Sequence, residues 1–328
     1  KDYAHVSAIY AGESVGKSEV VINTVDGNKT VTLKTNAEGG ERAMVQAVKD
    51  YKITINGILD TSQTNNEAVR VGAGSEVAIN GGVLGGTDST VAIRLEDGGK
   101  VKINQDGTKK VVTNGAIILD GESNAELVDG ERSIIYGTED SAHNGAITNN
   151  GSNAQNFAVE FRNGADWTGD ARRVNLDVLL NGEGTEWTGS YDATDVDGNV
   201  IAGKGLTLTV KDGAVWNNTK TSASDVASLN GANGFVNMGV GNLNIASYGG
   251  DTTFVYNNVN GVVAEGGAVT VATAKENSSV TMRTAYNASL EDATIREQAF
   301  DDLAEKLTYT AYVQDERNLT GKVEIAEG

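Results

Sequence analysis

FAVEFRNGADWTGD (157–170), NLDVLLNGEGTEWTGS (175–190) and LTLTVKDGAVWNNT (206–219) are three versions of one sequence pattern. Each begins with an alternating strand, turns at a glycine and continues into a second short strand. A tryptophan stands three residues after a glycine in each segment, at Trp167, Trp187 and Trp216. Because successive side chains of a strand point to opposite faces, each tryptophan shares a face with the small residue two positions before it. We therefore expect these three indoles to point into a core rather than to form an exposed aromatic stripe.

The spacing of the turns predicts the architecture. From Gly74 through Gly98, Gly121, Gly164 and Gly184 to Gly213 the steps are 24, 23, 43, 20 and 29 residues. The longest step corresponds to two coils, and the last contains a loop at 191–199. A repeat of about 20 to 24 residues fits one coil of a β-solenoid, in which each coil covers the apolar edge of its neighbour. We predict an all-β, right-handed parallel β-helix with short helical decorations, running as a single elongated region over 1–328. In this fold Trp167, Trp187 and Trp216 form a ladder along the core. A β-sandwich array with hairpin pairing is the alternative.

Composition agrees with a chain of turns and paired strands. The 328 residues include 41 glycines, no proline and 17 Asn-Gly or Asp-Gly pairs. Proline cannot donate a backbone hydrogen bond, so its absence suits a backbone that is paired almost everywhere. The lack of cysteine excludes disulfides and thiolate metal sites. A net charge of −19 argues against nucleic acid or anionic lipid as a partner.

Some segments depart from the repeat. Residues 1–50 are less regular and are expected to form N-terminal coils or a cap, with a short helix at 40–51. The polar stretch 138–156 is expected to be a surface loop. Residues 289–307 predict a helix with Ser289 as N-cap, placed as an insert or cap near the C-terminal end.

Two motifs near the N-terminus resemble catalytic signatures. Residues 11–18 approximate a phosphate-binding loop, and Gly12–Gly16 match the G-x-S-x-G pattern of a hydrolase nucleophile. Both motifs require a helix immediately afterwards, whereas the following residues alternate like a strand. We therefore predict no catalytic site here. His5 and His143 are too few for a histidine metal site and are expected to be polar surface residues.

A loop rich in aspartate is the remaining candidate site. It contains Asp192, Asp195 and Asp197, whose oxygens suit Ca²⁺ but whose spacing does not match an EF-hand. A solvated turn that contacts a partner is favoured over a weak cation site, and no catalytic residue, cofactor or metal is predicted. A pair of carboxylates for glycoside cleavage needs no sequence motif, so a polysaccharide-cleaving enzyme remains the alternative function.

The strand, Asn/Asp-Gly turn and G-A/T-x-W frame of 157–219 resembles passenger domains of bacterial type V autotransporters, which are parallel β-helices. The tail LAEKLTYTAYVQDERNLTGKVEIAEG (303–328) is similar to the stretch that closes such passengers, and the resemblance extends in style over most of 50–328. It implies export to the bacterial cell surface, anchored to or released from the outer membrane. It also implies an outer-membrane translocator barrel C-terminal to this chain, which has neither a barrel nor a signal peptide and would then be a fragment or processed passenger.

The predicted function is non-enzymatic: adhesion, self-association or a stalk that projects a binding surface. The expected partners are a host or bacterial surface receptor, either glycan or protein, or a second copy of the chain.

Overall fold

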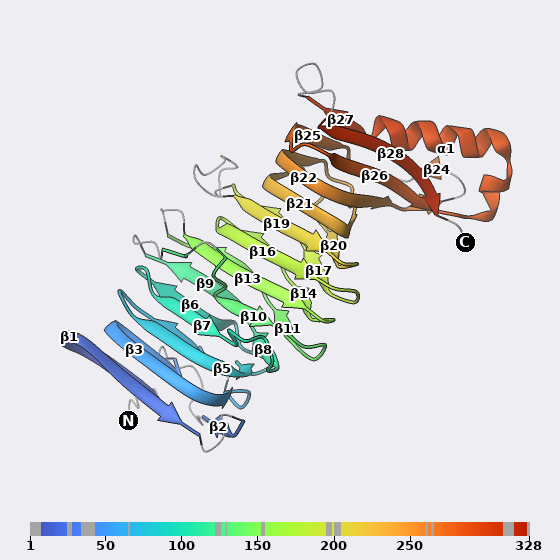
Figure 1. The fold of residues 1–328 in the computed structure, drawn as a ribbon. Helices are drawn as coiled ribbons and strands as arrows, with labels where there is room; N and C mark the ends of the chain where they lie inside the picture. Colours follow the sequence, from blue (N-terminus) through green and yellow to red (C-terminus); the bar gives the residue numbers. More distant parts are fainter. Residues whose placement is uncertain are drawn as a thin grey trace. The chain divides into compact units, whose positions relative to one another are not determined.

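The computed structural model describes residues 8–24, 28–33, 43–64, 66–121, 126–128, 130–151, 155–194, 199, 205–259, 262–263, 266–310 and 318–326. Apart from one short antiparallel pair, Asn258–Val259 with Val262–Val263, its strands pair in parallel and stack in the order of the sequence, so the predicted parallel β-helix is confirmed (Figure 1). The chain divides into two compact units, Lys1–Asp177 with Ala193–Lys204 and Val178–Asp192 with Gly205–Gly328. The prediction of one continuous region over 1–328 stays a prediction.

In the first unit the strands form three ladders of parallel pairs. One ladder joins the start of β3 to β4, β6, β9, β12 and β15. A second joins the middle of β3 to β5, β7, β10 and β13, and a third joins β2 and the end of β3 to the end of β5, β8, β11 and β14. The strands are β1 (Ile9–Asn23), β2 (Thr30–Thr32), β3 (Val45–Asp60), β4 (Val69–Val71), β5 (Glu76–Leu84), β6 (Val91–Glu96), β7 (Lys100–Ile103), β8 (Val111–Asn114), β9 (Ala116–Asp120), β10 (Ile134–Tyr136), β11 (Ala142–Asn144), β12 (Ile147–Asn149), β13 (Asn156–Arg162), β14 (Asp166–Thr168) and β15 (Ala171–Arg172).

The second unit contains two further parallel ladders. The first joins β19 to the first halves of β21 and β22 and then to β25 and β27. The second joins β17 to β20, to the second halves of β21 and β22, and then to β26 and β28. The elements after β15 are β16 (Asn175–Asn181), β17 (Glu186–Gly189), β18 (Tyr191–Asp192), β19 (Leu206–Lys211), β20 (Val215–Asn218), β21 (Ser224–Asn237), β22 (Leu243–Tyr256), β23 (Asn258–Val259), β24 (Val262–Val263), β25 (Val269–Ala274), β26 (Ser278–Ala285), a 3₁₀ turn (Ala288–Glu291), α1 (Ala293–Glu305), β27 (Leu307–Tyr309) and β28 (Leu319–Ala326).

Like residues stack on like residues in the core. In the first ladder of the first unit one buried aliphatic residue from each coil lies in register with the next, over Val69, Ile93, Ile117, Ile147 and Ala171. Val69, Ile93 and Ile117 follow one another at intervals of 24 residues, within the predicted repeat. Burial of a valine or isoleucine side chain in this column stabilises the fold by about 1.5–3 kcal/mol relative to leaving the side chain exposed. A thin continuous core therefore holds the coils together.

Predicted Asn-Gly and Asp-Gly turns such as Asn163-Gly164 and Asp212-Gly213 form corners of the coils. Asn163 and Gly164 have φ angles of 58° and 85°, and Asp212 and Gly213 have φ angles of 56° and 86°. Asparagine and aspartate tolerate this left-handed region better than other side chains, and glycine adopts it freely. Because the chain turns at Asn163-Gly164, β13 ends in the second ladder and β14 begins in the third.

Two predicted departures from the repeat are wrong. The stretch 138–156, expected to be a surface loop, contains β11 and β12, which pair with strands of the coils on both sides. Its strands have three residues each, so few apolar positions mark them. Of residues 40–51, expected to contain a short helix, the structure describes 43–51, and these run instead into β3, where Val45 pairs with Val69. A short apolar run fits both the helical and the strand period, and parallel pairing decided between them.

The predicted helix within 289–307 is present as α1, docked on β28 and β26 (Figure 1). Its N-cap is Asp292 rather than Ser289, and the Asp292 carboxylate accepts hydrogen bonds from two backbone N–H groups of the first turn. Leu303 is buried, whereas Phe300 is 38% exposed. The motifs at 11–18 lie within β1, so a strand continues where both catalytic motifs require a helix.

Candidate functional surfaces

The three tryptophans lie in the core, each with at most 1% of its surface exposed. Trp187 and Trp216 are register partners in the second unit, and their rings stack with centroids 5.1 Å apart and planes at 15°. In the first unit Trp167 stacks on Phe161 at 5.8 Å and 9°. The Trp187–Trp216 step of the predicted ladder is thus present, and the step from Trp167 to Trp187 stays a prediction.

The indole N–H groups of Trp167 and Trp216 are bonded to glycine carbonyls of the preceding coil. Trp167 Nε1 donates to the Gly145 carbonyl at 3.0 Å, and Trp216 Nε1 donates to the Gly189 carbonyl at 3.1 Å. In both pairs the glycine stands two positions after the residue that lies in register with the tryptophan. A Cβ on Gly145 would lie 2.4 Å from the Gly115 carbonyl oxygen, so no larger residue fits. The close approach of neighbouring coils therefore requires glycine at position 145, whose carbonyl accepts the hydrogen bond from Trp167.

A hydrogen-bonded polar group lies in the core beside Trp167. Thr113 Oγ1 lies 2.6 Å from His143 Nδ1 and 2.8 Å from the Tyr136 hydroxyl oxygen. Burial lowers the pKa of His143 to about 3, so the ring is neutral at physiological pH. The prediction that His143 is a surface residue is wrong, because the middle residue of β11 faces inward. His5 lies outside the described residues.

Of the predicted aspartate-rich loop, the structure describes Asp192, while Asp195 and Asp197 lie outside the described residues. Lys220 Nζ lies 3.3 Å from Asp192 Oδ1 and donates to the Tyr191 carbonyl at 3.0 Å. Within the part of the chain that the structure covers, no three His, Asp or Glu side chains are grouped to hold a metal ion. Asp192 is thus held in an ion pair, and the contact role of the loop stays a prediction.

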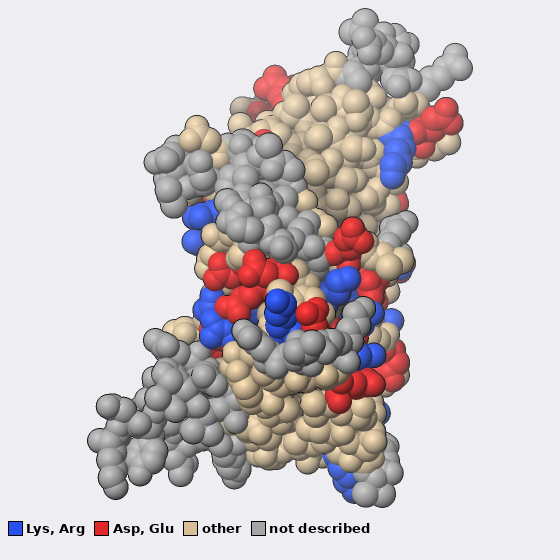
Figure 2. Space-filling view, turned by 90° about the vertical axis from the view of Figure 1, so that its left-hand side faces the viewer, with Lys and Arg blue, Asp and Glu red and all other residues tan. Residues whose placement is uncertain are grey.

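Opposite charges are interleaved on the outer surface of the first unit. Arg94 pairs with Glu67 at 2.7 Å and with Asp120 at 3.2 Å, and Arg70 pairs with Glu96 at 2.7 Å. Arg70 and Arg94 are register partners, so these acids separate two like charges that would otherwise repel each other. Figure 2, which shows one face of the molecule, has Lys and Arg beside Asp and Glu rather than a patch of one sign. These ion pairs indicate that the charged side chains form a ladder whose role is structural.

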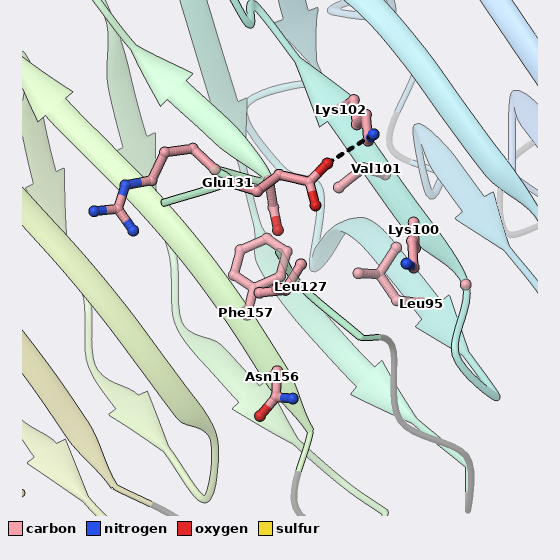
Figure 3. Close-up of a pocket in the computed structure, with 11 residues that line it drawn as sticks. Leu95, Lys100, Val101, Lys102, Leu127, Glu131, Asn156 and Phe157 are labelled. Carbon is pink, nitrogen blue, oxygen red and sulfur yellow. Dashed lines mark ion pairs between the residues drawn. The ribbon is translucent and has the colours of Figure 1, made fainter. Parts of the chain in front are cut away.

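A small pocket opens beside this ladder (Figure 3). Apolar side chains such as Leu127 and Phe157 line it together with the Lys102–Glu131 ion pair, whose atoms lie 2.7 Å apart. Its volume of about 10 Å³ holds about one water molecule. The hydrogen bond from Lys102 lowers the pKa of Glu131. The pocket therefore offers neither room for a sugar ring nor a protonated acid.

The second ladder of the second unit presents a different outer surface, which we call the polar-aromatic face. Two columns of outward side chains follow its strands in register, and none of these residues is buried. The first column is Glu186, Val215, Phe235, Thr253, Thr281 and Lys322, and the second is Thr188, Asn217, Asn237, Val255, Arg283 and Glu324.

Side chains of the polar-aromatic face bind one another along the column. Asn237 Nδ2 donates to Asn217 Oδ1 at 2.6 Å, and Asn217 Nδ2 donates to Thr188 Oγ1 at 3.0 Å. Arg283 Nη2 donates to both carboxylate oxygens of Glu324 at 3.1 Å, and its Cζ lies over the Phe235 ring, 5.7 Å from the centroid. These contacts hold the amides and the aromatic ring in fixed positions.

Sequence reasoning missed the polar-aromatic face. Its phenylalanine follows a register shift between Ala232 and Gly234, where the alternation of β21 changes face. The Asn233-Gly234 pair was a usable signal, because it marks the corner after which Phe235 and Asn237 share one face.

The described carboxyl groups with a clear pKa shift, Asp106 and Glu131, both have a lowered pKa. For Asp106 the main cause is the backbone N–H of Thr108, and for Glu131 it is Lys102. The general acid of a glycosidase needs the opposite shift.

No helix within the described ranges is long and apolar enough to span a membrane. Compared with models of protein families, with curated proteins and with solved structures, the chain matched none. The functional conclusion therefore depends on the residues of this chain alone.

Proposed function

We propose that the chain is a non-enzymatic bacterial surface protein of the autotransporter-passenger type that acts in adhesion. The observation that carries this proposal is the polar-aromatic face, where outward side chains stay in register over six paired strands. A regular face of this kind suits an extended partner, because each strand adds one weak contact and the contacts act together. Enzyme sites are instead concave and surround a small reacting group.

The electrostatics also support binding over catalysis. The two described carboxyl groups with a clear shift have a lowered pKa, which suits ionised surface groups rather than general acids. The ion pairs of the first unit neutralise one another locally, so these side chains form no patch of one sign that would draw in a charged substrate. The resemblance of 157–219 to autotransporter passengers supports display at the cell surface, with a translocator barrel C-terminal to this chain.

One experiment tests both whether the chain holds beads on a surface and whether it cleaves glycans. Beads coated with the full chain are incubated with epithelial monolayers, with bacterial cells and with immobilised glycans, while released reducing ends are measured in parallel. We expect retention of the coated beads on at least one surface without release of sugar. Sedimentation velocity of the free chain tests self-association in the same buffer.

Beads coated with heat-unfolded chain control for adsorption that needs no folded surface. Release of reducing ends would make the chain a polysaccharide-cleaving enzyme and overturn the proposal. Retention no greater than that of the unfolded control, together with a monomer in sedimentation, would also overturn it.

A further inference from the structure

The three strands at the centre of the polar-aromatic face carry no charged residue in its two columns. These strands, β20, β21 and β22, contribute only Val215, Asn217, Phe235, Asn237, Thr253 and Val255. The charged residues of the columns stand on β17, β26 and β28, and the one that reaches back over Phe235, Arg283, is paired with both carboxylate oxygens of Glu324. The two columns therefore offer no unpaired cation for a phosphate, sulfate or carboxylate group, and the net charge of −19 repels polyanions further.

Phe235 gives this centre a flat apolar element. Its side chain is half-buried on the outer surface, and Arg283 reaches back from β26 to brace its ring. A fixed aromatic ring of this kind matches the apolar C–H face of a sugar ring, as it matches other flat partners. The neighbouring Asn237 amide is exposed and bonded to Asn217 through one donor, so its carbonyl oxygen is positioned to accept a hydrogen bond from a sugar hydroxyl.

The repeat of the face suits a chain of sugars. Neighbouring strands of a sheet lie ~4.8 Å apart, close to the length of one pyranose ring in an extended oligosaccharide. A sugar chain that runs across the strands can therefore place successive rings opposite successive rungs. Thr253 and Thr281, which follow Phe235 in the same column, offer hydroxyl groups at the next two rungs.

We propose that the polar-aromatic face binds a linear oligosaccharide of neutral sugars, with one ring stacked on Phe235 and its hydroxyls bonded to the Asn217–Asn237 ladder and to Thr253. The proposal rests on the adhesive function proposed above and names the partner of its face. Arg283 acts as a positioning residue that holds the phenylalanine ring.

Binding is measured by isothermal titration calorimetry of the full chain. The probes are cellohexaose, chitohexaose, maltohexaose and laminarihexaose, with hexagalacturonate as the charged comparison. We expect at least one neutral hexasaccharide to bind, and Phe235→Leu to weaken it about tenfold or more, because leucine lacks the flat ring. Phe235→Trp keeps a flat ring and should retain binding. Phe300→Leu is the matched control, since Phe300 is an exposed phenylalanine on α1.

Thermal unfolding and circular dichroism of each variant establish that it is folded before titration. Failure of all four neutral probes, preference for hexagalacturonate, or equal loss in Phe235→Leu and Phe300→Leu would overturn the inference. The bead assay separates this result from the adhesive function. Phe235→Leu beads that still adhere would leave adhesion standing on another surface, whereas wild-type chain that binds the sugar but not cells would remove adhesion alone.

Discussion

His143 shows how burial changes the chemistry of one residue in this fold. Its ring lies in the core between Tyr136 and Trp167, with ring centroids 6.2 and 5.7 Å away. The folded chain keeps the ring neutral because its pKa falls to about 3, whereas the unfolded chain has the usual value of 6.5. Protons therefore bind the unfolded chain preferentially between these two pKa values. Folding stability that depends on neutral His143 is complete above pH 6.5 and is lost as the pH falls toward 3.

We expect His143→Gln to flatten this pH dependence, because glutamine keeps hydrogen-bonding groups and does not titrate. Between pH 7 and pH 4.5 the wild-type chain should lose on the order of 1–3 kcal/mol more unfolding free energy than the variant. Urea unfolding at each pH, followed by tryptophan fluorescence, measures the difference. Parallel curves for the two proteins would show that His143 is not the group responsible.

The sequence alone predicts that the tryptophans face the core, but it does not predict that His143 does. The frame around Trp167 puts a small residue on the same side and an acid on the other, so alternation alone predicts the inward face. His143 stands in a strand of three residues, Ala142–Asn144, where neither neighbour is strongly apolar. The hydroxyl of Thr113 that makes its burial acceptable comes from the preceding coil, 30 residues earlier. Only the register between coils brings the two together.

At the scale of secondary-structure elements, the ion pairs that Arg70 and Arg94 form between coils of the first unit offer the sharpest test. Arg94 is 18% exposed and bonds Glu67, which is 15% exposed, so removal of the guanidinium leaves a largely buried carboxylate. Arg94→Met should lower the free energy of unfolding by about 1–3 kcal/mol. Arg172→Met is the matched control on the same ladder, since Arg172 is 57% exposed in its pair with Asp170. It should change stability by at most about 0.5 kcal/mol.

Urea midpoints of the two variants in low and high salt provide the measurement. The larger loss in Arg94→Met should persist in 1 M salt, because a partly buried pair is screened less than an exposed one. Equal and small losses in both variants would mean that the ladder adds nothing to stability.

Element prediction succeeded where length or turn chemistry was distinctive. The helix α1 has thirteen residues and a capping aspartate, and its existence was predicted with a different N-cap. The predictions for 40–51 and 138–156 were wrong for different reasons. In the first, Ala43 and Ala47 fitted a helical period, although both are buried around the start of β3. In the second, strands of three residues gave too few apolar positions to show any period.

For the whole molecule, the repeat makes stability a local property. A coil of a solenoid contacts mainly the coils next to it, so a defect is felt near its own position. Each of the two units has its own buried column, aliphatic at Ile93 and Ile117 in the first and aromatic at Trp187 and Trp216 in the second. We therefore expect the two units to unfold in separate transitions.

One glycine in each unit provides a local defect. A Cβ on Gly82 would lie 1.8 Å from the Leu59 carbonyl oxygen, and one on Gly250 would lie 1.9 Å from the Gly231 carbonyl oxygen. Both glycines also have positive φ, at 142° and 80°. Substitution by alanine should thus cost about 2 kcal/mol or more in the unit that carries it.

The tryptophans report on each unit separately. Trp187→Phe/Trp216→Phe leaves Trp167 as the reporter of the first unit, and Trp167→Phe leaves the other two as reporters of the second. Gly82→Ala should lower the urea midpoint only in the first background, and Gly250→Ala only in the second. The unsubstituted chain in each background is the control for the tryptophan replacements themselves. If either alanine lowers both midpoints equally, the units unfold together, and the coils are coupled over a longer range than contact between neighbours explains.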